Sequence, residues 1–206
     1  PSGKLNSRKS KGYVRDVFQQ THMNNLQGNI GIGHVRYPTA GGVGKEFAQP
    51  MYVNTPYGIS LAHNGNLTNS KKLAAELFHA ERRHINTESD SEVLLNIFAL
   101  ELSKQEAVFP KPKDFFAAVE KTHLRINGAY AVVALITGYG ILAFRDPLGI
   151  RPLTIGVRKG ENRNEYVVSS ETAHFSATGF KVLRDVEPGE AVFIDNSGKI
   201  FTQQCF

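Results

Sequence analysis

Three stretches of the chain place apolar residues three and four positions apart, which is the spacing of one helix face. They predict helices over residues 69–82, 89–102 and 112–125. The second has a marked start, because Ser89 and Glu92 have the spacing of a capping box. The apolar positions of the three faces are Leu73, Ala74, Leu77 and Phe78, then Val93, Leu94, Ile97 and Phe98, then Phe115, Phe116, Val119 and Leu124.

The second half of the chain has the pattern of strands. The run Ala129–Thr137 is rich in Ala, Val, Leu and Ile, which suits a strand buried on both faces, and Gly138–Gly140 predicts a hairpin turn after it. Helices clustered between groups of strands favour an α+β fold with largely antiparallel sheets. The other predicted strands cover residues 29–36, 57–63, 141–145, 152–157, 166–169, 191–194 and 199–202.

The chain is expected to form a single domain over residues 1–206, because it contains no internal repeat and no linker long enough to divide it. Residues 1–12 are rich in Ser, Lys and Gly and predict a loop. The segment Pro38–Pro50 contains three glycines and predicts a flexible loop between two strands.

The composition excludes several classes of protein. Hydrophobic residues make up 41% and charged residues 21%, as in ordinary globular chains, which argues against wholesale disorder. The longest apolar run, Ala129–Ile136, is far short of the roughly 20 residues of a membrane helix, so no membrane association is expected. The single cysteine, Cys205, cannot form an internal disulfide, and the polar, basic start is unlike a secretory signal. A cytoplasmic location is expected.

The net charge of +5 comes from one segment. Five basic residues and no acidic residue lie in the first 15 positions, whereas the other 19 basic residues are balanced by 19 acidic ones. A solvated run of charge is the expected interpretation, and binding of nucleic-acid phosphates through residues 4–15 is the alternative. No zinc-finger spacing or aromatic-basic motif supports nucleic acid as a partner, so none is expected.

Four short segments contain most of the candidate chemistry: residues 33–39, 62–66, 85–92 and 144–153. Each also has a structural interpretation. Arg36 could form a surface ion pair, Asn64-Gly65 is a common turn dipeptide, and Asp90 is an acid favoured at a helix start. Arg145 and Asp146 could form a salt bridge with each other.

Together, these segments resemble the glutaminase domains of amidophosphoribosyltransferases, a group within the class II glutamine amidotransferases. The resemblance covers residues 12–205, and its most specific motifs are Tyr37-Pro38-Thr39, residues 66–69 and residues 144–153. Leu148 stands where this family usually has Asn. The resemblance implies an N-terminal-nucleophile fold, a four-layer αββα sandwich with antiparallel sheets, incomplete here on its N-terminal side.

The resemblance also implies roles for individual residues. Arg36 matches the clamp for the α-carboxylate of glutamine, Thr39 a supporting hydroxyl and Asp90 the partner of the α-ammonium. The amide of Asn64 and the backbone N–H of Gly65 match the oxyanion hole. The implied activity is hydrolysis of glutamine to supply ammonia for conversion of phosphoribosyl diphosphate to phosphoribosylamine, in purine biosynthesis.

The implied nucleophile is a cysteine at the mature N-terminus, whereas position 1 is Pro1 and Cys205 lies at the opposite end. The sequence is therefore expected to be an interior piece, inactive alone, of a longer homo-oligomeric enzyme. No cofactor or metal is expected in this segment; Mg²⁺ and phosphoribosyl diphosphate belong to an acceptor domain, and an iron–sulfur cluster in the parent is left open. The alternatives are another class II amidotransferase and a non-catalytic module for glutamine binding or assembly.

Overall fold

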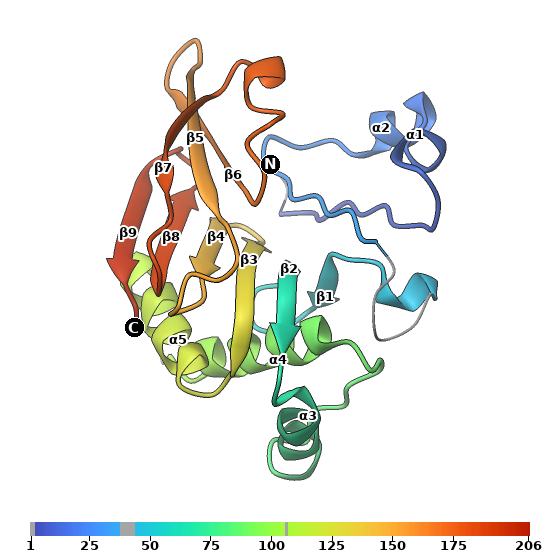
Figure 1. Cartoon of the computed structure of the whole chain (residues 1–206), viewed down its shortest axis with the longest axis vertical. Helices are drawn as coiled ribbons and strands as arrows, with labels where there is room; N and C mark the ends of the chain where they lie inside the picture. Colours follow the sequence, from blue (N-terminus) through green and yellow to red (C-terminus); the bar gives the residue numbers. More distant parts are fainter. Residues whose placement is uncertain (1–2, 38–43, 106) are drawn as a thin grey trace.

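The computed structural model describes residues 3–37, 44–105 and 107–206. Its core is a six-stranded antiparallel sheet in the order β1-β2-β3-β4-β8-β9, on which a three-stranded sheet in the order β6-β5-β7 packs (Figure 1). The strands are β1 (Met51–Val53), β2 (Ile59–Leu67), β3 (Gly128–Ile136), β4 (Gly140–Arg145), β5 (Thr154–Lys159), β6 (Asn164–Ser169), β7 (Lys181–Asp185), β8 (Glu190–Asp195) and β9 (Ile200–Gln204).

Three longer helices cover one side of the six-stranded sheet: α3 (Ser70–His79), α4 (Asp90–Ser103) and α5 (Pro112–His123). The predicted helices are confirmed to within three residues at each end. The shorter helices are α1 (Val14–Val17), α2 (Gln20–Asn25), and the 3-10 turns η1 (Lys45–Phe47) and η2 (Ser176–Thr178). None of the helices in the described ranges is long and apolar enough to cross a membrane.

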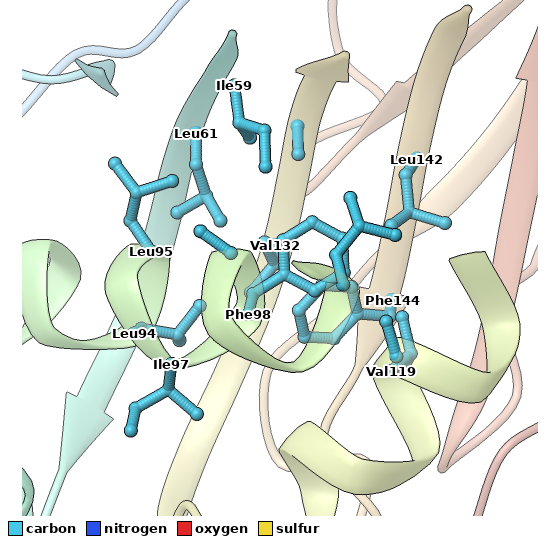
Figure 2. Close-up of a cluster of buried hydrophobic side chains, with 14 of the residues drawn as sticks. Ile59, Leu61, Leu94, Leu95, Ile97, Phe98, Val119, Val132, Leu142 and Phe144 are labelled. Carbon is cyan, nitrogen blue, oxygen red and sulfur yellow. The ribbon is translucent and has the colours of Figure 1, made fainter. Parts of the chain in front are cut away.

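Helix α4 is buried along most of its length because it contacts β1 and β2 as well as α3 and α5. A helix that is apolar on most sides needs such surroundings. Figure 2 shows Leu95 and Phe98 of this helix on the side of the central strands, where Leu61 and Val132 belong to the same core cluster. Phe98 meets Phe144 of β4 with ring centroids 6.1 Å apart, so the aromatic contact joins the helix layer to the sheet.

Strand β3 is buried on both faces, as its apolar composition predicted. One face of β3 belongs to the core beneath the helices, through Tyr130, Val132, Ala134 and Ile136. Ala131 and Val133 belong to a second core that includes Ile155 of the three-stranded sheet. Because β3 pairs with β2 over nine residues, this double packing fixes the position of β2.

One predicted strand is wrong, and two strands of the structure were not predicted. Residues 29–36 form no strand, because no other described segment pairs with their backbone. Strand β1 was missed because it has three residues, and β7 because Val182 and Leu183 are both exposed and give no alternation.

The basic segment at the start of the chain is not wholly solvated, contrary to expectation. Lys9 is half-buried and donates a hydrogen bond to the carbonyl of Pro50 at 3.2 Å. Burial lowers the pKa of Lys9.

Candidate active site

Asn64 and Gly65 lie inside strand β2, paired with Ala131 and Tyr130 of β3, so the interpretation of this dipeptide as a turn is wrong. The oxygen Oδ1 of Asn64 accepts a hydrogen bond from Nη2 of Arg151 at 2.7 Å. An amide has one acceptor end and one donor end. The contact with Arg151 therefore directs the donor end, Nδ2, away from the guanidinium.

Gly65 occupies a backbone conformation that excludes other residues. Its φ is +145°, and a Cβ atom there would lie 1.9 Å from the carbonyl oxygen of Ala129. The clash is with backbone of the paired strand, which cannot rotate away. A glycine is therefore required next to Asn64.

Asp90 is the first residue of α4 and lies against the end of β2. Its Oδ2 accepts the backbone N–H of Leu67 at 3.0 Å, and its Oδ1 is 3.9 Å from Nδ1 of His63. The position at a helix start favours a carboxylate. Asp90 therefore links the start of α4 to β2, the strand that also contains Asn64. Its negative charge lies at Leu67, the last residue of that strand.

The expected capping box at this helix start is absent. Ser89 is the N-cap residue but makes no side-chain cap bond. Glu92 instead accepts the backbone N–H groups of Asn86 at 2.9 Å and Thr87 at 2.7 Å. The carboxylate of Glu92 thus orders the loop before Asp90 rather than the first turn itself.

His63 is buried at the centre of a hydrogen-bond network beneath the site. The Gln49 side chain accepts its N–H at 2.7 Å and donates to its carbonyl at 3.2 Å, while Nδ1 of His63 contacts Oγ of Ser91 at 3.1 Å. Burial lowers the pKa of His63 to about 4, against the opposing effect of the Asp90 carboxylate. The imidazole is therefore neutral at pH 7, and the network joins the loop after η1 to both β2 and α4.

Arg36 lies near the end of the extended segment before the loop. Its guanidinium carbon is 5.6 Å from the centre of the Phe47 ring. His34, two residues earlier, has its pKa lowered by burial and then by the charge of Arg36, whereas a hydrogen bond to the backbone of His63 opposes both effects. His34 thus connects the segment of Arg36 to β2. Thr39 lies outside the described residues.

Arg145 and Asp146 do not pair with each other in a salt bridge, contrary to expectation; both bind backbone instead. Asp146 is fully buried and its carboxylate accepts the N–H groups of Leu148, Ile150 and Arg151 at 3.0–3.1 Å. Arg145 donates to the carbonyl of Gly149 at 2.7 Å and to those of Arg151 and Val186. The two side chains hold the loop at residues 146–151 through its backbone groups.

Comparison with known proteins decides the family. Residues 43–177 match the family described as a glutamine amidotransferase domain. The chain belongs to this family. In this glutamine amidotransferase domain, Asn64 and Gly65 lie on β2, Asp90 contacts the same strand at Leu67, and the segment of Arg36 is connected to β2 through His34.

Individual relatives of this glutamine amidotransferase domain are longer proteins. The chain is 56% identical over 202 residues to an amidophosphoribosyltransferase of Pseudomonas aeruginosa, covering 98% of this chain and 40% of the relative. It is 57% identical over 199 residues to the Escherichia coli amidophosphoribosyltransferase, covering 96% of this chain and 39% of that protein. The chain thus spans about two fifths of the length of these relatives.

The fold of the domain is shared with a solved structure. Glutamine phosphoribosylpyrophosphate amidotransferase from B. subtilis, complexed with ADP and GMP, is similar with a TM-score of 0.80 and 33% identity, covering 99% of this chain and 41% of that chain. The expected α+β fold of the N-terminal-nucleophile type, with antiparallel sheets, is confirmed.

Sequence reasoning missed two side chains that contact the site of this amidotransferase domain. Arg151 bonds Asn64 across 87 positions of sequence, and Gln49 bonds the backbone of His63. The only signal for Arg151 was its place in the string at residues 144–153. Gln49 had none. Nowhere in the described ranges do three or more His, Cys, Asp or Glu side chains form a cluster that could hold a metal ion.

Cys205 lies away from the site, in the core beneath the helices of the amidotransferase domain. Its Sγ is 3.7 Å from the carbonyl oxygen of Phe116 in α5. Burial raises the pKa of this thiol to about 12, and the charge of Glu120 adds to the effect. A nucleophile must be ionised at working pH, so Cys205 is not suited to attack an amide.

We predict that Cys205 resists thiol reagents while the protein is folded. A thiol with a pKa of about 12 has roughly three orders of magnitude less thiolate at pH 8 than a free cysteine. Labelling of the 206-residue chain, which contains one cysteine, should therefore be at least about a thousandfold slower than labelling of glutathione. The same chain in guanidinium chloride should react at the glutathione rate; equal rates before and after unfolding would contradict the buried placement.

Proposed function

We propose that this chain is the glutaminase part of an amidophosphoribosyltransferase. It hydrolyses glutamine and supplies ammonia for conversion of phosphoribosyl diphosphate to phosphoribosylamine. The identities of 56% and 57% to proteins of that name support the proposal. Because those proteins are longer, the acceptor chemistry, with Mg²⁺ and phosphoribosyl diphosphate, is assigned to further parts of a longer protein. A cytoplasmic location and a homo-oligomeric state belong to the same proposal.

The observation that carries the glutaminase proposal is the joint position of Asn64 and Asp90. Free glutamine is a zwitterion with a carboxamide at its far end, so a specific site needs an anion and an amide-polarising donor that can contact the two ends of the molecule. Asp90 contacts the N–H of Leu67, three residues beyond Asn64 on the same strand. Since strands rise by about 3.3 Å per residue, the two positions are about 10 Å apart, which suits an extended glutamine with a hydrogen bond of about 3 Å at each end.

We assign each residue one task in binding. Arg36 pairs with the α-carboxylate, for which a planar guanidinium is suited, and Thr39 supports it with a hydroxyl. Asp90 accepts hydrogen bonds from the α-ammonium. Asn64 and Gly65 donate to the carboxamide oxygen of the substrate. His63 stays neutral and supports these groups through Ser91 and the backbone.

The reaction follows from the same assignment. A thiolate adds to the carboxamide carbon, and the electron pair of the C=O bond moves to oxygen, where Asn64 and Gly65 stabilise the negative charge. Collapse of this intermediate breaks the C–N bond, and the nitrogen leaves as ammonia after taking a proton. Water then cleaves the thioester and releases glutamate. Because Cys205 is buried, the thiol is assigned to a residue outside residues 1–206, and this segment alone is expected to be inactive.

Loss of either charged partner should impair glutamine use but not ammonia use. In the native full-length protein, Arg36→Ala and Asp90→Ala each remove a charge-assisted hydrogen bond worth about 1.5–3 kcal/mol. We expect kcat/KM for glutamine to fall about tenfold to a few hundredfold, mainly through KM. Phosphoribosylamine formation from free ammonia should be unchanged.

Two matched controls test whether this effect is specific to the site. Arg158→Ala removes a guanidinium that stacks on Phe180 at 4.6 Å, as Arg36 does on Phe47, but in the three-stranded sheet. Asp114→Ala removes a carboxylate from the first turn of α5, where it accepts the N–H of Lys111. Both should keep wild-type glutamine kinetics. Equal losses in the control and site variants would reject the clamp assignment.

A further inference from the structure

We propose that Arg151 is a positioning residue that sets which end of the Asn64 amide faces the substrate and strengthens that end as a donor. The inference rests on the proposed glutaminase function. It is carried by the 2.7 Å hydrogen bond from Nη2 of Arg151 to Oδ1 of Asn64, and by the loop that fixes the guanidinium in place.

The backbone of the loop at residues 146–151 is hydrogen-bonded by two side chains. The buried carboxylate of Asp146 accepts the N–H of Arg151 itself at 3.0 Å, and Arg145 donates to the Arg151 carbonyl at 2.6 Å. Both backbone groups of Arg151 are thus bound by residues at the end of β4. Gly149 has a φ of +62°, and a Cβ there would lie 2.8 Å from Cγ of Pro188, so this conformation of the loop requires glycine at position 149.

The position of the guanidinium selects one orientation of the Asn64 amide. Arginine has only donors, so the amide must present its oxygen to Arg151. The NH₂ group is then forced to the other side. Without Arg151 the amide could turn over, and an oxygen facing a developing oxyanion would repel it rather than stabilise it.

The charge of Arg151 also acts on the donor strength of Asn64. A cation bound to the carbonyl oxygen of an amide draws electrons from its nitrogen and makes the N–H groups more polar, which is the cooperativity of linked hydrogen bonds. The same charge reaches His63, whose pKa it helps to lower. Arg151 therefore contributes to a positive environment where the negative charge of the intermediate develops.

Arg151 holds this position although part of its own side chain is unsatisfied. Among the described residues, its Nε is a buried donor with no hydrogen-bond partner. A buried donor without a partner is unfavourable for stability. The bond to Asn64 is the contact through which this guanidinium acts on the candidate site.

The test compares variants of Arg151 in the native full-length protein, with glutamate formation measured per folded molecule. Arg151→Met should lower kcat for glutamine about tenfold to a hundredfold with KM nearly unchanged, since the oxyanion donor is misoriented for much of the time. Arg151→Lys keeps a donor-only cation and should recover most of the loss. Arg163→Met, which removes an exposed guanidinium bonded to the Asn196 carbonyl, is the control and should keep wild-type kcat.

A double-variant cycle separates positioning from loop stability. If Arg151 acts through Asn64, adding Arg151→Met to Asn64→Ala should lower kcat no further than about twofold. An equal loss in both backgrounds, or no recovery with Arg151→Lys in a folded protein, would overturn the inference. Turnover that Arg151→Met leaves unchanged would overturn this inference alone. No glutamine turnover by the unmodified protein would overturn the proposed function and the inference with it.

Discussion

Replacing Asn64 with alanine should lower the glutamine-dependent kcat of the native full-length protein by about 10²–10³, the usual loss for one oxyanion donor. The amide acts on charge that appears only in the transition state, so KM should change little. Asn64 lies inside β2 with its oxygen bonded to Arg151, which is the geometry of a fixed donor rather than of a turn residue.

The control for this variant is Asn66→Ala, on the same strand two residues further along. It removes the same side chain from an exposed position and should leave kcat at the wild-type value. Activity with free ammonia should survive in both variants. If Asn64 were only structural, Asn64→Ala would lower the amount of folded protein while each folded molecule kept its turnover, and titration of active sites would show this directly.

Replacing Gly65 with alanine should have the largest effect on stability. The new Cβ would lie 1.9 Å from the Ala129 carbonyl oxygen at a φ of +145°, so β2 and β3 would have to separate at this pair. We expect a loss of about 4 kcal/mol or more, and a fall in Tm of about 10 °C or more, in thermal unfolding.

Gly138→Ala is the matched control for the steric argument. Gly138 also has a positive φ, +84°, but a Cβ there meets nothing within 4 Å. Only the conformational strain remains, and the loss should be about 1 kcal/mol. Equal Tm values for the two variants would show that the backbone of β3 moves at Ala129 to make room for the new Cβ. Packing would then not require glycine at position 65.

Most of the helices and central strands were predictable because burial dictates their pattern. Helix α4 and strand β3 are surrounded by protein, so their apolar residues gave a clear signal. Strand β7 is different: Val182 and Leu183 are both exposed, so no alternation marks it. The apolar residues at 29–36 wrongly predicted a strand. A strand also needs a neighbouring strand with which to form hydrogen bonds, and the sequence of one segment cannot show whether there is one.

The sequence indicated candidate site residues, but not the side chains that hold those residues in position. Asn64, Gly65 and Asp90 stood out through a family resemblance, and the structure brings them to one strand end. Contacts between distant positions leave no local pattern, which is why the bond from Arg151 to Asn64 was missed. The Ser89 capping box failed for a related reason: Glu92 had better partners in the preceding loop at Asn86 and Thr87.

The most direct measurement is a crystal structure of the native full-length protein with bound L-glutamate, the product of the proposed reaction. We expect the α-carboxylate at Arg36, the α-ammonium at Asp90, and a side-chain carboxylate oxygen at about 3 Å from Nδ2 of Asn64 and the N–H of Gly65. We also expect Oδ1 of Asn64 to remain hydrogen-bonded to Arg151. Glutamate bound in the reverse orientation, or away from the end of β2, would contradict the proposed site.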